Sequence, residues 1–158
     1  MDEALSKIFT RNKTRKGFWS GLAGIGTRRT EDPRKSFSGF VSLAAGEPKI
    51  KVPKNAGKGG RNLHMGLEAI KNKMITKENL SNSVFISFAS DGMDNSDVAG
   101  AIVDKNTIEK AEKLGLDMND YANRFDSYNF FQKTGDLIIT GSTGANVSDL
   151  MILLTKKE

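Results

Sequence analysis

A glycine-rich, basic segment is the first part of the sequence that could bind a ligand. Residues 57–62 read Gly-Lys-Gly-Gly-Arg-Asn, between a candidate strand and a candidate helix. Glycines let consecutive backbone N–H groups point into one concavity, and Lys58 and Arg61 add positive charge suited to a phosphate or a carboxylate. The segment is neither a Walker A loop nor a complete Gly-x-Gly-x-x-Gly motif. It predicts an anion site, with a solvated turn as the alternative.

An acidic segment follows the apolar run 83–89. Its carboxylates Asp91, Asp94 and Asp97 are spaced three residues apart. They could hold Mg²⁺ together with water, or accept the proton of a substrate hydroxyl, although the spacing is not that of an EF-hand. The alternative is that one or two of them only cap the segment 98–103.

A third loop, residues 140–146, combines hydroxyl side chains and glycines between two apolar runs. Its backbone donors could wrap a phosphate or a sugar-like hydroxyl, and the same composition is ordinary in hairpins. All three loops flank predicted strands, and open α/β sheets gather their ligands at strand ends. We therefore expect the three loops to contribute to one site.

The elements that must position these loops follow from apolar patterning. Strands are predicted over 40–45, around Ile50 and Val52, over 83–89 as a strand buried on both faces, and over 137–140 and 150–154. Strands that alternate with helices predict an α/β fold, a layered mixed β-sheet with flanking helices.

Three helices are predicted between these strands. The first carries the stripe Leu63, Leu67, Ile70 and Met74, with Asn62 as its N-cap. The second begins with a capping box of Asn106 and Glu109 and ends at Gly115, and the third runs from Asp126 to Gly135.

Length and charge indicate one domain with an appendage. The chain has 158 residues, and residues 1–62 hold 14 Lys/Arg against 5 Asp/Glu, whereas residues 63–158 hold 10 against 14. Residues 1–38 sustain no helical or strand period, so we expect a poorly ordered basic arm there and a single compact domain over 39–158. Nucleic-acid binding by this arm is a minor alternative, since the arm carries no recognisable motif for it.

Composition excludes several kinds of site and compartment. The chain has no cysteine and one histidine, His64, which excludes a thiolate zinc site, a catalytic thiol and a multi-histidine metal site. No apolar stretch is long enough for a membrane helix, and the acidic N-terminus does not resemble a secretory signal. We expect a cytoplasmic protein with no membrane partner.

Taken in order, a series of segments resembles the MOFRL domain, the C-terminal part of the class II glycerate 2-kinases, which are often called hydroxypyruvate reductases. These segments are 46–47, 57–62, 91–94, 99–104, 126–131, 135–138 and 140–150. The resemblance covers about residues 42–155.

The resemblance implies transfer of the γ-phosphoryl group of ATP, with Mg²⁺, to the 2-hydroxyl of D-glycerate, in a cleft shared with a larger N-terminal domain. Arg61 and Asp91 would be the catalytic residues, and Asp91 with Asp94 would face the metal. The residues implied in binding substrate or phosphate are Glu47, Lys58, Gly59, Gly60, Asn62, Gly141, Thr143, Gly144 and Asn146.

The sequence departs from the family pattern at several of these loops. Ala45 and Pro48 flank Gly46-Glu47 in place of Gly and Thr, and Leu63-His64 replaces Gln-Glu. Asn95-Ser96 stands where Gly-Pro-Thr is usual, and Phe125 replaces Asn. In the third loop Ser142, Ala145 and Ser148 replace Pro, Thr and Asn.

Two functions remain open at this point. The chain is expected to be the C-terminal domain of a glycerate 2-kinase, inactive without the missing N-terminal domain, which a separate polypeptide or a homo-oligomer could supply. The alternative is a non-enzymatic module that binds a nucleotide or a small acid and serves regulation or assembly.

Overall fold

The computed structural model describes residues 39–72 and 81–156, and the predicted basic arm over 1–38 lies outside these residues. The strands are β1 (Gly39–Ala45), β2 (Ser83–Ala89), β3 (Gly100–Val103), β4 (Leu137–Ile138) and β5 (Asp149–Lys156). The helices are α2 (Arg61–Lys71), α4 (Lys105–Lys113), α5 (Met118–Asn123) and α6 (Ser127–Thr134). In this part of the chain, no helix is long and apolar enough to cross a membrane.

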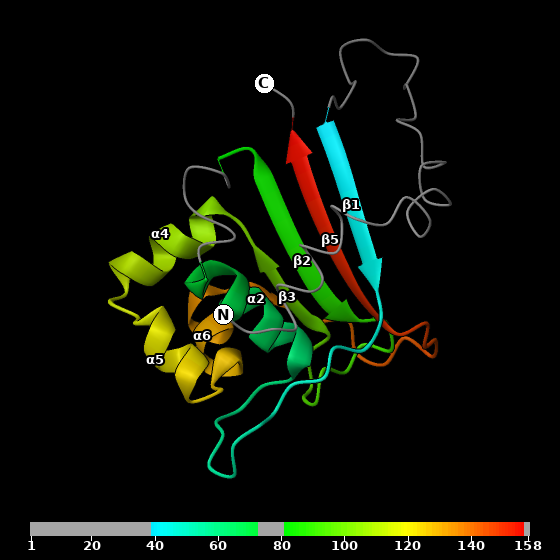
Figure 1. Ribbon diagram of the computed structural model, residues 1–158, viewed down its shortest axis with the longest axis horizontal. Helices are drawn as coiled ribbons and strands as arrows, with labels where there is room; N and C mark the ends of the chain where they lie inside the picture. Colours follow the sequence, from blue (N-terminus) through cyan, green and yellow to red (C-terminus); the bar gives the residue numbers. More distant parts are fainter. Residues whose placement is uncertain (1–38, 73–80, 157–158) are drawn as a thin grey trace.

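The five strands form one sheet in the order β1-β5-β2-β3-β4 (Figure 1). The predicted α/β fold with flanking helices is confirmed. The sheet is antiparallel at every strand pair, so the predicted mixed sheet is wrong in that detail. β1 and β2 do run in the same direction, but the C-terminal strand β5 lies between them and pairs with both.

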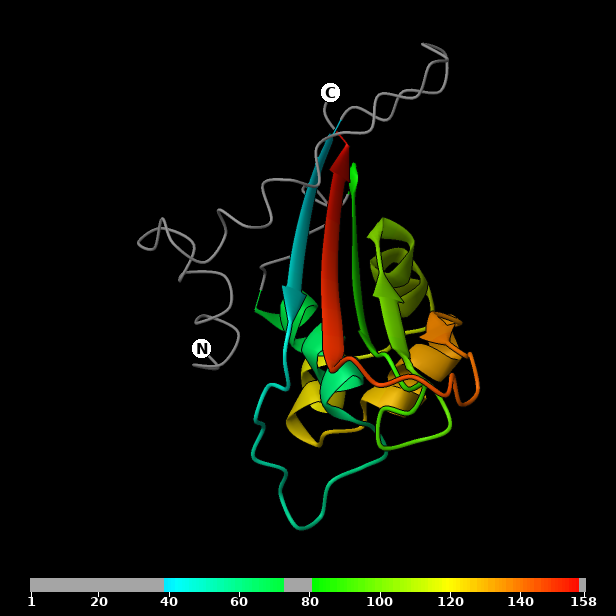
Figure 2. The ribbon, with the colours of Figure 1, turned by 90° about the vertical axis from the view of Figure 1, so that its right-hand side faces the viewer.

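Burial alternates along β2, which distinguishes the two faces of the sheet. Phe85, Ser87 and Ala89 are buried, whereas Val84, Ile86 and Phe88 are half-buried, so the prediction of a strand buried on both faces is wrong. The helices gather around β2 and β3, and the far ends of β1 and β5 extend beyond α2, α5 and α6 (Figures 1 and 2). The core thus lies between the helices and one face of the sheet.

The core is built from the apolar stripe of α2 and from aromatic residues of α6. Its largest fully buried apolar side chains are Leu63, Leu67, Phe85, Val98, Val103, Phe130 and Phe131. Burying side chains of this size is the main stabilising contribution to such a fold. Leu63, Leu67 and Ile70 occupy the positions that their helical spacing predicted, and Met74 lies outside the described residues.

Several local predictions are corrected by the structure. Ile50 and Val52 lie in an irregular loop and not in a strand, and the strand predicted over 137–140 contains only Leu137 and Ile138. Short alternating runs do not by themselves distinguish strand from loop, because strand formation depends on the cross-strand neighbours. Helix α5 was not predicted.

The helix ends differ from prediction in their capping residues. The capping box of α4 is formed by Asp104 and Thr107, two residues before the predicted pair. α6 ends at Gly135, whose φ of 75° is the left-handed conformation expected of a C-terminal glycine. α2 begins at Arg61 with Gly60 at its N-cap position, so Asn62 is inside the helix and is not its cap.

Candidate functional site

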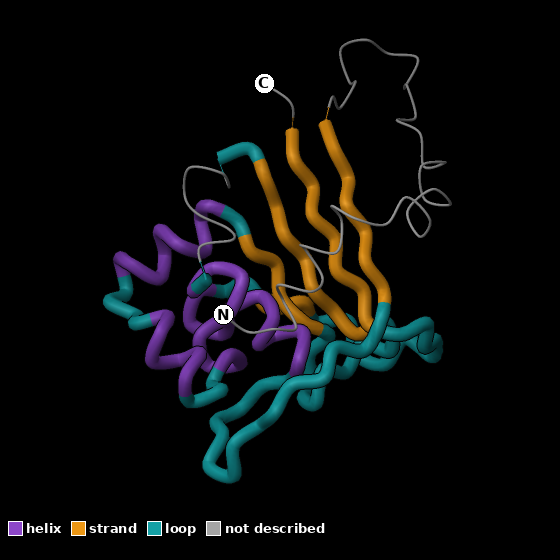
Figure 3. Tube along the Cα trace, viewed as in Figure 1, coloured by secondary structure: helices purple, strands orange, loops and turns teal. Residues whose placement is uncertain are grey.

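The three predicted loops meet at one end of the sheet, as expected. One follows β1, one follows β2, and the third leads from β4 into β5 (Figure 3). Hydrogen bonds join the second loop to the third, since the Thr143 hydroxyl donates to the Ser90 carbonyl at 2.6 Å and the Val147 N–H donates to the Ser90 hydroxyl at 2.8 Å. The antiparallel sheet brings together the strand ends from which these loops depart.

Arg61 forms an ion-pair cluster with two carboxylates. Its Nε donates to Asp149 Oδ2 and its Nη2 donates to Asp149 Oδ1 at 3.4 Å, while Nη1 lies 3.3 Å from Glu47 Oε2. The Asp149 side chain is 3% exposed and that of Glu47 is 58% exposed. The hydrogen bond with Asp149 raises the pKa of Arg61 further. Asp149 therefore holds the guanidinium from the buried side, and Glu47 occupies its accessible side.

Asp94 caps α2 from a different loop. Its Oδ1 accepts from the backbone N–H of Asn62 at 3.0 Å, and its Oδ2 accepts from the N–H of Leu63 at 2.8 Å. These are donors of the first helical turn that have no partner within the helix. Burial raises the pKa of Asp94, and the backbone donors Leu63 and Asn62 offset this effect in part. The helix N-terminus predicted to attract a ligand anion is thus occupied by a carboxylate of the chain itself.

Asn62 connects this cap to the sheet. Its Nδ2 donates to Asp94 Oδ1 at 3.1 Å, and its Oδ1 accepts from the Ser87 hydroxyl of β2 at 2.8 Å. The residue has no exposed surface. The structure thus places Asn62 in the core and in contact with Asp94, although the sequence pattern assigned it to ligand binding.

The glycines of segment 57–60 allow other loops to approach the backbone closely. A Cβ at Gly60 would collide with the Asp94 carbonyl and carboxylate, and one at Gly59 would collide with the Ser127 hydroxyl. At Gly57 it would lie 2.5 Å from the Cβ of Asp126. Only glycine fits such contacts. Packing against α6 and the acidic loop accounts for these glycines without a bound phosphate.

Lys58 contacts the acidic loop and α6. Its Nζ donates to Asp97 at 3.1 Å and lies 3.3 Å from the centre of the Tyr128 ring. The hydrogen bond from Lys58 lowers the pKa of Asp97. A cation over an aromatic face is stabilised by the ring quadrupole. The Lys58 ammonium is therefore engaged within the chain.

Asp91 faces the third loop. Its Oδ1 accepts from the Met93 N–H at 3.0 Å, and Asn146 Nδ2 lies 3.4 Å from its Oδ2. The Asp91 carbonyl accepts from the Thr143 N–H at 3.1 Å. All four predicted residues of the third loop are exposed. Thr143 and Asn146 contact the acidic loop through hydrogen bonds, the Gly141 carbonyl lies against Gly92, and Gly141 and Gly144 adopt positive φ.

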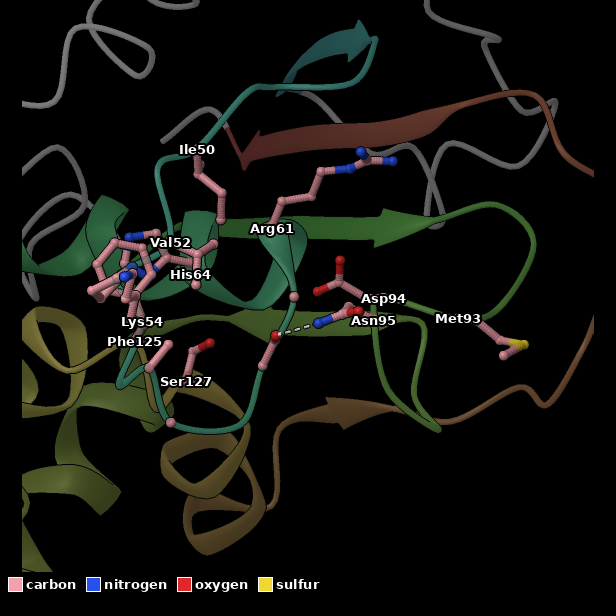
Figure 4. Close-up of a pocket in the computed structure, with 15 residues that line it drawn as sticks. Ile50, Val52, Lys54, Arg61, His64, Met93, Asp94, Asn95, Phe125 and Ser127 are labelled. Carbon is pink, nitrogen blue, oxygen red and sulfur yellow. Dashed lines mark hydrogen bonds between the residues drawn. The ribbon is translucent and has the colours of Figure 1, made fainter.

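A pocket of about 580 Å³ lies beside the glycine segment (Figure 4). Four predicted residues, Gly59, Gly60, Arg61 and Asp94, line it together with residues that were not predicted. The other lining residues are Ile50, Val52, Pro53, Lys54, Ala56, Gly57, His64, Met93, Asn95, Phe125 and Ser127. In Figure 4 the Arg61 side chain extends toward β5, away from His64 and Phe125.

Two departures from the family pattern pack on each other in this pocket. The rings of His64 and Phe125 are stacked, with their centroids 4.1 Å apart and their planes 10° apart. The family pattern has Glu and Asn at these positions. Here the chain replaces two polar residues with an aromatic contact.

Three departures also adopt a left-handed backbone. Asn95, Phe125 and Ser148 have φ of 50°, 56° and 80°, and they are the non-glycine residues of positive φ among those described. The family pattern has Gly, Asn and Asn there, the residue types that adopt this conformation most readily. Phe125 and Ser148 suit this conformation less well than asparagine does.

Sequence reasoning missed Asp149, which contacts Arg61 more closely than any predicted residue. A buried carboxylate needs a cation or hydrogen-bond donors beside it. The acidic residue at the start of the apolar run 150–154 was therefore the feature of the sequence that could have indicated a partner such as Arg61. Asp126 was predicted only as a helix cap, yet it accepts from the Lys58 N–H at 3.1 Å.

The predicted magnesium ligands do not fit a metal site built by this chain alone. Both Asp94 oxygens accept N–H groups of α2. Across residues 39–72 and 81–156, no three His, Cys, Asp or Glu side chains gather to hold a metal ion. Of the two residues implied as metal ligands, Asp91 is half-buried and Asp94 is buried.

Comparisons with known proteins agree with this architecture. The model of the MOFRL family matches residues 40–149. The chain is 41% identical to a D-glycerate 2-kinase of Thermotoga maritima over 111 residues, which are 70% of this chain and 25% of that protein. It is 36% identical to a glycerate kinase of Danio rerio, over 71% of this chain and 23% of that protein. The chain spans about a quarter of the length of these relatives.

Solved structures show the same fold. A crystal structure of glycerate kinase from Thermotoga maritima superposes with a TM-score of 0.65 at 38% identity, over 73% of this chain and 27% of that chain. A crystal structure of a Pyrococcus horikoshii protein superposes with a TM-score of 0.67 at 30% identity, over 84% of this chain and 28% of that chain.

Replacing Asp94 distinguishes a cap from a metal ligand. We expect Asp94→Ala to lower the free energy of unfolding by about 2 kcal/mol, because buried N–H groups of α2 lose their acceptor. Asp91→Ala, in the same loop, should cost less than about 1 kcal/mol, since Asp91 accepts only at the loop surface. Urea denaturation measures both. A stability of Asp94→Ala equal to that of the wild type would contradict the capping role.

Replacing Ser148 tests the left-handed backbone. Ser148→Asn should raise the free energy of unfolding by about 0.5 kcal/mol, because asparagine tolerates positive φ better than serine. Ser148 donates its N–H to Asn146 Oδ1 and accepts the Ser90 N–H at its carbonyl, and the substitution leaves both backbone contacts in place. Ser142→Asn in the same loop is the matched control and should leave the melting temperature unchanged. Equal effects at both positions would contradict the strain at Ser148.

Proposed function

This chain belongs to the MOFRL family, and from that membership and the geometry of Arg61 we propose that it provides the C-terminal part of a glycerate 2-kinase active site. In this proposal the γ-phosphoryl group of ATP is transferred to the 2-hydroxyl of D-glycerate. We propose that turnover also requires the three quarters of the relatives that this chain does not match, supplied for example by a second polypeptide. The observation that carries the proposal is the arginine held by buried Asp149 where the three loops meet.

Arg61 is proposed to bind an anionic group of the substrates. Phosphoryl transfer depends on positioning and on neutralising charge more than on covalent chemistry with the protein. Asp149 engages Nε and Nη2 of the guanidinium, so Nη1, which the exposed Glu47 contacts, is the end that a carboxylate or a phosphate would take over. Because the Asp149 side chain is buried, the fork is oriented before a ligand arrives.

Glu47 is proposed to leave Arg61 when the ligand binds. It contacts the same Nη1 atom that a ligand would use, and its side chain is largely exposed. With Glu47 and Asp149 both present, Arg61 is already balanced by two negative charges. The half-site alone therefore binds anions weakly, and the completed site must add positive charge from the second polypeptide or from the magnesium ion that accompanies ATP.

The other loops are proposed to complete the substrate side of the site. Asp91, supported by Asn146 and the Met93 N–H, orients the 2-hydroxyl of D-glycerate. The segment 141–146 covers the ligand. Lys58, engaged with Asp97 and Tyr128, positions the glycine segment and does not itself contact the phosphate in this proposal.

Titration calorimetry of the full chain with D-glycerate and with Mg-ATP tests this proposal. We expect weak binding of at least one ligand, because the charge of Arg61 is only partly available. Glu47→Gln should tighten that binding several-fold by removing the competing carboxylate, and Arg61→Ala should abolish it. Arg61→Lys should weaken it, since lysine keeps the charge and loses the fork.

Lys105→Ala serves as the surface control, because Lys105 pairs only with Glu109 on the outer face of α4 in the contacts described. It should bind as the wild type does. Binding that survives Arg61→Ala would contradict the proposal, and so would the absence of binding by both the wild type and Glu47→Gln.

A further inference from the structure

The strand β1 forms an edge of the sheet that carries none of the usual protections. Its sequence, Gly-Phe-Val-Ser-Leu-Ala-Ala, contains no charged residue and no proline. All seven residues pair with β5 without a bulge. Phe40 and Val41 are 68% and 56% exposed. Natural edge strands are normally shortened, charged, bulged or covered, because a bare edge pairs with another strand.

The hydrogen-bond pattern shows which groups of β1 are available. The Gly46 N–H donates to the Asp149 carbonyl, so Gly46 faces β5. Groups facing one neighbour alternate along an antiparallel strand, and Phe40, Ser42 and Ala44 therefore also face β5. On the other side of β5 the Lys156 N–H donates to the Asn82 carbonyl, as the same alternation requires.

The remaining residues of β1 point their N–H and C=O groups away from the sheet. These residues are Gly39, Val41, Leu43 and Ala45. Among the residues that the structure describes, no strand pairs with this edge. A row of regularly spaced donors and acceptors on an apolar strand is a template for one further strand.

We propose that a second copy of this chain covers the edge, with two β1 strands paired antiparallel about a two-fold axis at Ser42. In this register Val41 lies opposite the partner's Leu43, and Gly39 opposite the partner's Ala45. In each of these pairs both residues direct their N–H and C=O groups toward the other strand. Every outward N–H and C=O group of β1 is therefore hydrogen-bonded in the dimer. The two sheets join into one of ten strands.

The side chains of β1 suit this self-pairing. Each cross-strand pair in the register is apolar or small, and no like charges meet. An antiparallel pair of identical strands satisfies two-fold symmetry by construction, which is the commonest symmetry of homo-oligomers. β1 has no charged side chain, and Phe40 is its one aromatic side chain. It therefore has few features by which it could select a strand of different sequence.

The pairing also determines where the two sites lie. β1 ends at the loop end of the sheet, so an antiparallel neighbour places the partner's loops at the opposite end. Neither copy then completes the site of the other. The dimer is thus independent of the proposed function, and its test does not depend on kinase activity.

The oligomeric state of the full chain tests the proposal. Analytical ultracentrifugation should give twice the mass of one chain for the wild type. Val41→Pro should halve that mass, because it removes an outward N–H while the ladder to β5 uses Phe40, Ser42 and Ala44. Val41→Thr keeps the N–H and should remain dimeric. Circular dichroism confirms that both variants fold.

Cross-linking tests the register. The chain has no cysteine, so a single introduced thiol has no background. Cα atoms of a non-hydrogen-bonded antiparallel pair lie about 4.5 Å apart, which suits a disulfide. Ser42→Cys should therefore form a disulfide-linked dimer on mild oxidation. Phe40→Cys should not, because the two thiols would be four residues apart along the strands, about 14 Å.

Each contrary result overturns the proposal. A monomeric wild type would mean that another occupant, such as a further segment of this chain, covers the edge. A dimer that survives Val41→Pro, or one that Ser42→Cys fails to cross-link, would place the interface on a different surface.

Discussion

The carboxylate of Asp94 is the contact on which the arrangement of the site depends. It joins the loop after β2 to the first turn of α2, and it accepts the backbone donors of Asn62 and Leu63. Its approach requires a glycine at position 60, and its partner Asn62 continues the connection to β2 through Ser87. Arg61 is the first residue of the same helix, so the position of its side chain follows from this cap. The burial of a charged group is tolerated here because helix donors surround it.

This internal cap changes the chemistry that the glycine segment can perform. A free helix N-terminus beside Lys58 and Arg61 would be a ready anion site. Asp94 occupies the helix N-terminus and Asp97 pairs with Lys58, so the pocket draws its remaining positive charge from Lys54 and from Arg61, and two carboxylates balance Arg61. The Arg61 guanidinium is therefore oriented by Asp149 and largely neutralised before any anion arrives.

Patterns of apolar residues predicted the fold class, the strand over 83–89, the stripe of α2 and the ends of α6, since these depend on periodicity and local turn chemistry. The three loops, which were predicted to flank strands, lie together at one end of the sheet. What could not be predicted were contacts between distant segments: the cap from Asp94, the clamp from Asp149, and the neighbours of β5. The residue types of the glycine segment predict an anion site or a solvated turn. In the structure three of its glycines allow close packing against Asp94, Asp126 and Ser127. Sequence spacing does not distinguish these two uses of glycine.

The most direct test is complementation. The full chain would be co-expressed with the Thermotoga maritima D-glycerate 2-kinase shortened by the region that this chain matches, and ADP formation from ATP and D-glycerate would be measured. The account predicts turnover only when both polypeptides are present, and its loss when this chain carries Arg61→Ala. Turnover by this chain alone would contradict the claim that it provides half of a site. Turnover of the mixture that Arg61→Ala leaves unchanged would contradict the role of the arginine.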